Sequence, residues 1–366
     1  MALNITGVNI NGVSIYDTLG LYTFSTFTFR SGGVIGSTGP TAAQLFANSY
    51  SNVGNTWLQS TSFYNTYGNG YQFWTVPITG SYQITAAGAR SGYPYFSVGN
   101  LANGNATVGS GAIIQATLNL TQGQILTLVV GQPSGNAGVG ATFSSTGGGG
   151  ASWVVDAALN PLIVAGGGAG GGNFTGGGSP ASRKGGNAVT TTSGGAGNVG
   201  ATPGGANGIG GNSHINSANT VSVNGYDAGG GGGFFANGVA GTGGNSRTVS
   251  GGTNTGGGGA AFRFGANGGG ASTSYTVGAT AGGFGGGGGA GPITGGGGGG
   301  YSGGGGTYGA TGTTQDAGGG GGSYIDSNAT SVGTSDGQYN NSSTLNGNIS
   351  TLGFNLGNGY ITITRV

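Results

Sequence analysis

The sequence predicts an all-β protein: an antiparallel β-sandwich with an inserted bundle of polyglycine-II helices and one short α-helix. Glycine supplies 98 of the 366 residues and stands in solid blocks, and the segments that flank this region are short, apolar and rich in aromatic residues. Glycine costs about 1 kcal/mol in a helix interior and brings no side chain to a strand, so the blocks are unsuited to ordinary secondary structure. The blocks are Gly147–Gly150, Gly166–Gly168, Gly229–Gly233, Gly256–Gly259, Gly285–Gly289, Gly295–Gly300, Gly303–Gly306 and Gly318–Gly322.

The first 50 residues predict short strands followed by one helix. Residues 1–26 alternate apolar and polar side chains and form an N-terminal β segment, a candidate for attachment or assembly. The alternation continues through Phe29. Pro40 suits the first position of a helix over Pro40–Tyr50, whose shared face consists of Ala43, Phe46, Ala47 and Tyr50.

Three pairs of strand-like segments follow, each joined by a short turn. Tyr71–Pro77 and Ser81–Ala87 predict a hairpin, and so do Ala112–Leu120 and Ile125–Val130, because glycine lies in each connection. The third pair is Ser152–Val155 and Leu162–Ala165, joined through the Asn160-Pro161 turn. Short strands separated by turn signals favour an antiparallel sandwich.

Strand character returns near the C-terminus, at Ser323–Asp326 and Tyr360–Thr364. We expect the last strand to pair with the earlier ones, so that residues 27–165 and 323–366 form one sandwich. The glycine region, residues 166–322, is then an insertion between its strands. Gly147–Val154 and Gly319–Ile325 nearly repeat each other, and in both a glycine block runs directly into a strand, which predicts that sandwich and bundle are fused.

The glycine blocks predict polyproline-II-type helices that lie side by side. Such a helix has about three residues per turn and no internal hydrogen bonds, so its N–H and C=O groups must find partners on neighbouring chains if they are buried. Only glycine lets several backbones approach that closely. The segments between blocks are rich in Asn, Ser and Thr, and we expect them to be loops at the bundle ends, where binding residues usually lie: Asn187–Thr202, Asn212–Asp227, Phe234–Thr255 and Ala271–Thr280.

Composition excludes several classes of function. Charged residues are 4% of the chain and the net charge is +1, so the clustered Lys and Arg that nucleic acid requires are missing. The chain has no Cys, which removes disulfides and thiolate metal sites. No stretch reaches eighteen apolar residues and the first residues lack signal-peptide features, so we expect neither membrane insertion nor classical secretion. An exterior type of protein without a secretion signal is typical of a virion component; non-classical secretion is the alternative.

Six motifs in order resemble a known family. They begin at Phe27–Arg30 and Gly39–Gln44 and continue through Gly70–Ile84, Ile125–Gln132, Gly147–Val154 and Pro161–Gly168. This order resembles the glycine-rich extracellular domain of anaplastic lymphoma kinase and leukocyte tyrosine kinase receptors, over roughly residues 27–366. The resemblance implies a tumour-necrosis-factor-like jelly-roll sandwich with inserted glycine helices. The receptors' cysteines, transmembrane span and kinase domain are absent here, so their signalling and ligand contacts are not carried over. A second similarity, in glycine blocks alone, is to phage long-tail-fibre adhesins.

The sequence predicts no enzyme and no cofactor or metal. His214 is the one histidine and lies in a loop-like composition, as a solvent-facing residue or a binding contact rather than a catalyst. The six Asp are scattered and no Glu is present. Four Asp lie near the ends of glycine blocks, where a carboxylate can accept backbone N–H bonds, with Ca²⁺ ligation as the alternative: Asp156, Asp227, Asp316 and Asp326.

Aromatic residues fall into two groups. Trp57, Trp74 and Trp153 lie in or beside strands and are expected in the sandwich core. Those near glycine blocks have two interpretations: they cover the ends of the bundle, or they form an exposed binding surface together with Arg, residue types that dominate interfaces. The candidate binding residues are His214, Tyr226, Phe234, Phe235, Arg247, Phe262, Arg263, Phe264 and Tyr275.

These observations lead to one functional expectation with two alternatives. We expect a non-enzymatic extracellular protein of a viral surface or tail fibre, which recognises a glycan or protein receptor on a host cell and attaches to a larger particle or to itself. The first alternative is an architectural subunit of a fibre or coat. The second is a secreted module that binds a protein ligand.

Overall fold

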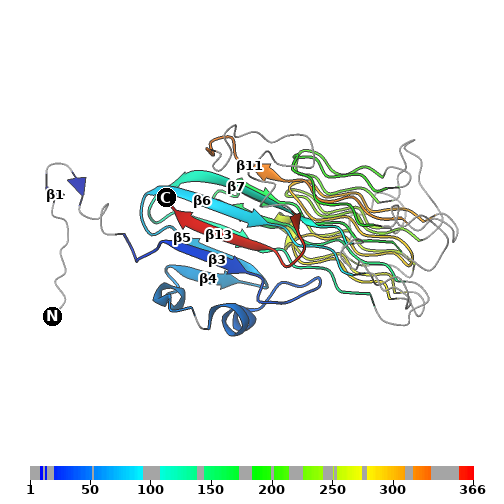
Figure 1. Cartoon of the computed structure of the whole chain (residues 1–366), viewed down its shortest axis with the longest axis horizontal. Helices are drawn as coiled ribbons and strands as arrows, with labels where there is room; N and C mark the ends of the chain where they lie inside the picture. Colours follow the sequence, from blue (N-terminus) through cyan, green and yellow to red (C-terminus); the bar gives the residue numbers. More distant parts are fainter. Residues whose placement is uncertain are drawn as a thin grey trace.

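The protein is built from two facing antiparallel β-sheets and a bundle of glycine segments that extends from one end of the sandwich (Figure 1). The computed structural model of the chain describes residues 9–10, 13–14, 20–51, 53–93, 108–137, 144–172, 184–198, 202–213, 226–241, 250, 254–273, 278–309, 316–330 and 354–366. Strands β1 (Asn9–Ile10) and β2 (Val13–Ser14) form a small antiparallel pair of their own within the predicted segment 1–26. The described strands, which form antiparallel sheets, confirm the predicted all-β class.

The two sheets have five and six strands. The first has the order β12-β7-β6-β13-β3, with bounds β12 Phe354–Asn355, β7 Gly111–Leu120, β6 Gly80–Ala87, β13 Tyr360–Arg365 and β3 Thr26–Arg30. The second has the order β11-β10-β9-β8-β5-β4, with bounds β11 Tyr324–Ile325, β10 Pro161–Ala165, β9 Ser152–Val155, β8 Ile125–Val129, β5 Tyr71–Thr75 and β4 Tyr64–Tyr67. The C-terminal strand β13 lies between β3 and β6, so the chain does return to the sandwich after the glycine region.

Two of the three predicted hairpins are wrong. Strand β5 pairs with β4 and β8, whereas β6 lies in the other sheet between β13 and β7. In the same way β7 and β8 lie in different sheets, so both short connections cross from one sheet to the other. The β9–β10 hairpin is confirmed. The jelly-roll topology stays a prediction.

The predicted helix is shorter than expected and begins with a capping box. Helix α2 (Ala42–Leu45) starts after Thr41, whose Oγ1 accepts the N–H of Gln44 at 3.2 Å while Gln44 Oε1 accepts the N–H of Thr41 at 2.8 Å. A π-helical turn, η1 (Phe46–Tyr50), continues it, and a 3₁₀ turn, η2 (Thr56–Gln59), follows. Leu45 and Tyr50 are buried, a spacing that suits the i→i+5 π turn, while the predicted face residues Ala43 and Ala47 are exposed.

Side chains from both sheets meet in the core of the sandwich. Inward residues alternate along each strand, for example Phe27 and Phe29 on β3 and Ile361 and Ile363 on β13. Trp57 and Trp74 belong to this core, as predicted. One polar side chain is buried with them: Gln72 accepts hydrogen bonds from the hydroxyls of Tyr50 (2.7 Å) and Tyr64 (2.9 Å) and donates to Arg30 O (3.1 Å).

The glycine segments bond to each other with a period of three residues. Along Gly295–Gly300, backbone N–H groups three residues apart donate to the same neighbouring segment, at distances of 2.8–3.1 Å. Gly295 donates to Asp316 and Gly298 to Gly319; Gly296 donates to Thr146 and Gly299 to Gly149. Gly297 donates to Gly229 and Gly300 to Gly232. Carbonyl oxygens of the same segment accept from three further segments, through Gly167, Gly288 and Gly304. A three-residue repeat is that of a polyproline-II-type helix, here surrounded by neighbours on all sides.

Backbone contact explains why side chains are excluded from this region. A Cβ built on Gly298 would lie 2.1 Å from Gly167 O, and one on Gly297 would lie 2.1 Å from Gly304 O. The buried N–H and C=O groups of the described glycine segments are thus paired between neighbouring segments rather than within a sheet or an α-helix.

The bundle also draws on residues outside 166–322. Strands β6 and β8 run on into glycine-containing segments: Ala89 N bonds to Gly150 O (2.9 Å), and Gly150 N bonds to Gln132 O (3.0 Å). Parts of two expected loops belong to it as well, since Gly195 N bonds to Gly320 O (2.8 Å) and Gly238 N to Gly259 O (2.9 Å). The glycine block Gly147–Gly150, which precedes the predicted start of the insertion at residue 166, takes part in the same pairing: Gly148 N bonds to Gly288 O at 2.9 Å.

Candidate binding surface

A second apolar core joins the glycine bundle to the outer face of the six-stranded sheet. On the sheet side it contains Trp153 and Val155 of β9, and on the bundle side Phe234, Phe262 and Phe284. Phe234 and Phe262 stack with ring centroids 5.0 Å apart and an interplanar angle of 7°, and Trp153 lies 5.8 Å from Phe262. The prediction that Trp153 lies in the sandwich core is therefore wrong. It is buried on the opposite face of its sheet, where the bundle replaces water.

The structure separates the predicted binding residues by exposure. Phe234 and Phe262 are 0% and 3% exposed, so they cover backbone and sheet rather than offer contacts. Phe235 and Phe264 are 40% and 64% exposed, and Arg263 between Phe262 and Phe264 is exposed too. Phe262, Arg263 and Phe264 form the 3₁₀ turn η4 (Phe262–Phe264), which buries its first residue and exposes the next two and ends at the left-handed C-cap Gly265 (φ 100°).

The other predicted residues do not join this cluster. Tyr226 is half-buried beside Thr294, whose hydroxyl donates to its carbonyl at 2.5 Å. It lies eight residues from Phe234 along the same glycine segment, which corresponds to about 25 Å at 3.1 Å per residue. His214, Arg247 and Tyr275 lie outside the described residues.

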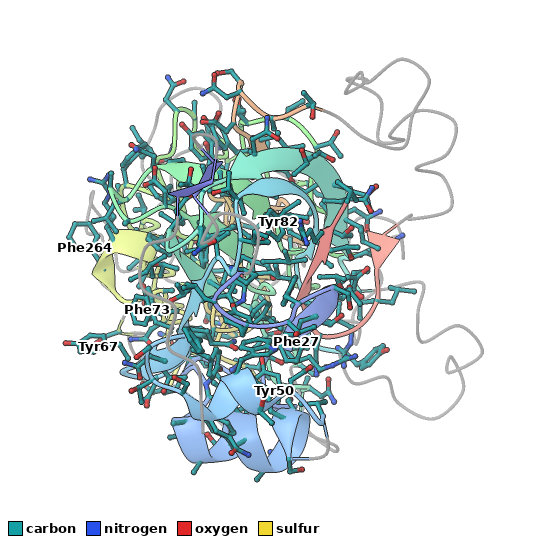
Figure 2. The ribbon with its side chains drawn as sticks, turned by 90° about the vertical axis from the view of Figure 1, so that its left-hand side faces the viewer. Phe27, Tyr50, Tyr67, Phe73, Tyr82 and Phe264 are labelled. Carbon is teal, nitrogen blue, oxygen red and sulfur yellow. The ribbon has the colours of Figure 1, made fainter. Side chains whose placement is uncertain are left out.

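The exposed side of η4 forms one wall of a groove of about 720 Å³ at the junction of bundle and sandwich. Strands β4, β5 and β8 supply the floor, through Tyr67, Tyr71, Phe73 and Thr127. A neighbouring hollow of about 390 Å³ shares Phe73, Thr127 and Leu159 with it and extends the surface along the sheet. Figure 2 shows Tyr67, Phe73 and Phe264 on the same flank of the molecule.

Sequence reasoning missed the half of this groove that the sandwich contributes. Tyr71 and Phe73 alternate with the buried Gln72 and Trp74 on β5, so they point to the outer face. That alternation was the available signal. A second signal was the run of aromatic residues on both sides of the β4–β5 turn, where Tyr67 is 75% exposed.

Arg263 is held in the wall by three interactions. Its Nη2 donates to Leu159 O at 3.2 Å, and its guanidinium lies 4.8 Å from the ring centroid of Phe235 and 5.6 Å from that of Phe234. Leu159 adopts φ 62° in the β9–β10 turn, which Asp156 fixes by accepting the N–H of Asn160 at 2.7 Å. The residues that line the groove include no carboxylate, so Arg263 is its one formal charge.

Hydrogen bonding also fixes the floor to the wall. The hydroxyl of Tyr71 donates to Phe262 O, and burial raises the pKa of Tyr71 well above its usual value, so this hydroxyl stays protonated and keeps donating. The groove therefore has rigid sides that come from residues almost 200 positions apart in the chain.

Three of the predicted aspartates, Asp156, Asp227 and Asp326, accept backbone N–H groups near the glycine blocks, as predicted. Asp156 and Asp326 do so within turns, the latter from Asn328 N at 2.8 Å, and Asp227 accepts from Gly309 N at 3.3 Å inside the bundle. Asp227 is buried, and this burial raises its pKa to about 7 against the opposing effect of the Gly309 hydrogen bond. Within the described residues, no three His, Asp or Glu side chains gather in a way that suits a metal ion.

No protein-family model matches the chain, and a search of curated proteins finds no significant match. In the described part of the chain, no helix has the length and apolar character that a membrane crossing requires.

Proposed function

We propose that this chain is a non-enzymatic adhesion protein of a viral surface or tail fibre that recognises a receptor on a host cell. The observation that carries the proposal is the open, aromatic groove between sandwich and bundle, whose two walls are rigidly joined. Aromatic and Arg side chains dominate the energetics of recognition, and rigid walls lower the ordering cost of binding. The backbone cross-links of the glycine bundle support this rigidity.

The architecture supports the same assignment. The resemblance to the receptor family implies a tumour-necrosis-factor-like sandwich that carries inserted glycine helices, and the proposal adopts this arrangement. In this proposal the sandwich holds the protein on its particle, outside the cell, and the bundle presents recognition residues. The chain's low charge and lack of Cys suit such exposure.

Cell attachment tests the proposal directly. The full chain, labelled with a fluorophore, is incubated with a panel of bacterial and animal cells, and bound fluorescence is measured by flow cytometry. We expect saturable binding to a subset of the panel. The double variant Tyr67→Ala with Phe73→Ala, which truncates two aromatic rings of the groove lining, should weaken this binding at least about tenfold. Leu356→Ala, an exposed residue outside the groove lining, is the matched control.

Electron microscopy of the purified chain distinguishes adhesion from architecture. Discrete particles together with cell binding support the adhesin. Filaments or regular arrays without cell binding would support a subunit of a fibre or coat, assembled through residues 1–26 or through the edge strands β3 and β4.

A further inference from the structure

We propose that the groove between η4 and the β4–β5–β8 face binds an oligosaccharide that carries a carboxylate or sulfate group. This inference rests on the proposed function and names the class of receptor. Three features of the groove carry it: exposed aromatic rings, neutral amide side chains, and one cation without an acidic neighbour in the lining.

The aromatic rings suit the apolar face of a sugar ring. Tyr67 is largely exposed, and Phe73 lies between the two hollows on the floor. The C–H groups on one face of a pyranose make favourable contacts with an aromatic face, much as C–H donors do with other electron-rich groups. The volume of about 720 Å³, extended by the neighbouring hollow of about 390 Å³, accommodates several sugar units rather than one.

Polar side chains around the rings suit hydroxyl groups. Asn69 and Asn267 both line the groove, one from the β4–β5 turn and one from the residues after η4. An amide both donates and accepts, so it can pair with two neighbouring hydroxyls of a sugar. The polar groups are thus few and placed around an apolar floor, as in other small-molecule sites.

Arg263 specifies the charge of the ligand. The rings of Phe234 and Phe235 hold the guanidinium in place, and among the described residues it makes one hydrogen bond, to Leu159 O. A guanidinium has five N–H donors, so most of them face the groove or solvent and match a planar or tetrahedral anion. Because the groove lining has no Asp or Glu, an anionic substituent on the sugar complements the site.

A peptide ligand is a poorer fit to the floor. Strands β5 and β8 are both paired on both sides, so their backbone groups are already used in the sheet. A peptide that binds by strand addition needs an unpaired edge; the edge of this sheet on the side of the floor is β4, so an added strand would lie beside the floor, beyond β4, rather than over β5 and β8. The groove presents side chains instead.

The test uses an array of immobilised oligosaccharides in which each neutral backbone is paired with versions that carry sialic acid, uronic acid or sulfate. The full-length labelled chain is applied as wild type, Arg263→Gln, Tyr67→Ala and, as the control for loss of one positive charge, Arg365→Gln. Arg365 is exposed on β13 in the other sheet. Thermal unfolding of each variant confirms that it is folded.

We expect wild type to prefer the anionic member of at least one pair. Arg263→Gln should lower the affinity for that anionic member about tenfold or more and leave the neutral member unchanged. Tyr67→Ala should weaken both members, and Arg365→Gln neither. Whether carboxylates or sulfates are preferred identifies the source of the charge.

Four results would overturn the inference. Equal loss of anionic binding in Arg263→Gln and Arg365→Gln would indicate a non-specific charge effect. Anionic preference that Tyr67→Ala and Arg263→Gln both leave unchanged would place the sugar elsewhere. A third result is that cells still bind the chain after periodate oxidation of their surface glycans while the array shows no binding. The receptor would then be a protein, so the proposed function would stand while this inference fails. Absence of both cell and array binding would refute both.

Discussion

Substitution of Gly298 by alanine measures how tightly the glycine bundle is packed. Gly298 lies at the centre of the segment that bonds to neighbours on all sides, and its φ is outside the left-handed region. A methyl group there therefore costs nothing in backbone strain. It would, however, lie 2.1 Å from Gly167 O and 2.8 Å from Gly321 N.

The expected cost follows from the bonds that this methyl would break. Ordinary contact begins at 3.4 Å, so the two segments must separate by about 1.3 Å, the difference between 3.4 and 2.1 Å. Gly167 O accepts from Gly321 N at 2.9 Å and Gly167 N donates to Gly299 O at 2.8 Å, and neither bond survives such a shift. Each broken bond leaves buried, unsatisfied groups and costs about 1–3 kcal/mol. Together with the cost of overpacking, the two broken bonds should lower the free energy of unfolding by about 5 kcal/mol.

Urea unfolding followed by tryptophan fluorescence tests this value. Trp153 contacts the bundle through Phe262, so its emission reports on loss of the bundle. Gly54→Ala is the matched control: a Cβ there meets nothing within 4 Å, and reduced freedom of the unfolded chain predicts a gain of about 0.4–1 kcal/mol. If Gly298→Ala unfolds within about 1 kcal/mol of Gly54→Ala, the close backbone packing described for this segment is refuted.

Three further predictions concern buried side chains. Asp227→Asn should remove a pH dependence of stability. Burial raises the pKa of Asp227 in the folded state from 3.8 to about 7, so the folded state holds a proton that the unfolded state releases, and the stability of the wild type falls by up to about 4 kcal/mol as the pH rises from about 4 to 7. Urea midpoints of the variant should be flat across this range. Phe234→Ala should cost about 3–5 kcal/mol and Phe235→Ala less than about 1, because only the first ring is fully buried; equal losses by calorimetry would contradict the second core. Gln72→Leu should cost about 2–4 kcal/mol in urea unfolding, since two tyrosine hydroxyls lose their acceptor; an unchanged midpoint would count against the network.

The sequence was sufficient for the class of fold because its strongest signals are local. Blocks of glycine exclude helix and sheet, and alternation along β3 and β13 places Phe29 and Ile361 in the core. It was insufficient for strand pairing. A short turn with glycine, such as the one after Pro77, is the same whether the chain folds back in one sheet or crosses to the other, and only the partners of β5 and β6 decide between them.

For the candidate site, the sequence indicated residue types but could not assign their exposure. Phe262 and Phe264 belong to the same short motif, yet one is buried and the other exposed because the 3₁₀ turn separates them. The burial of Phe262 depends on Trp153, which is more than a hundred positions away. The floor at Tyr67 and Phe73 was missed for a related reason: outward residues of a strand become a site only when another part of the chain forms a wall beside them.

The glycine bundle depends on the sandwich for more than attachment. Its segments have few side chains, so hydrophobic burial contributes mainly where Phe234, Phe262 and Phe284 meet the outer face of the sheet. The same contact positions Arg263 above the floor of the groove. A ligand in the groove touches both parts and binds only when they are joined, so it must stabilise their junction by mass action. Loss of the second core should therefore reduce ligand affinity even though Phe234 and Trp153 do not line the groove.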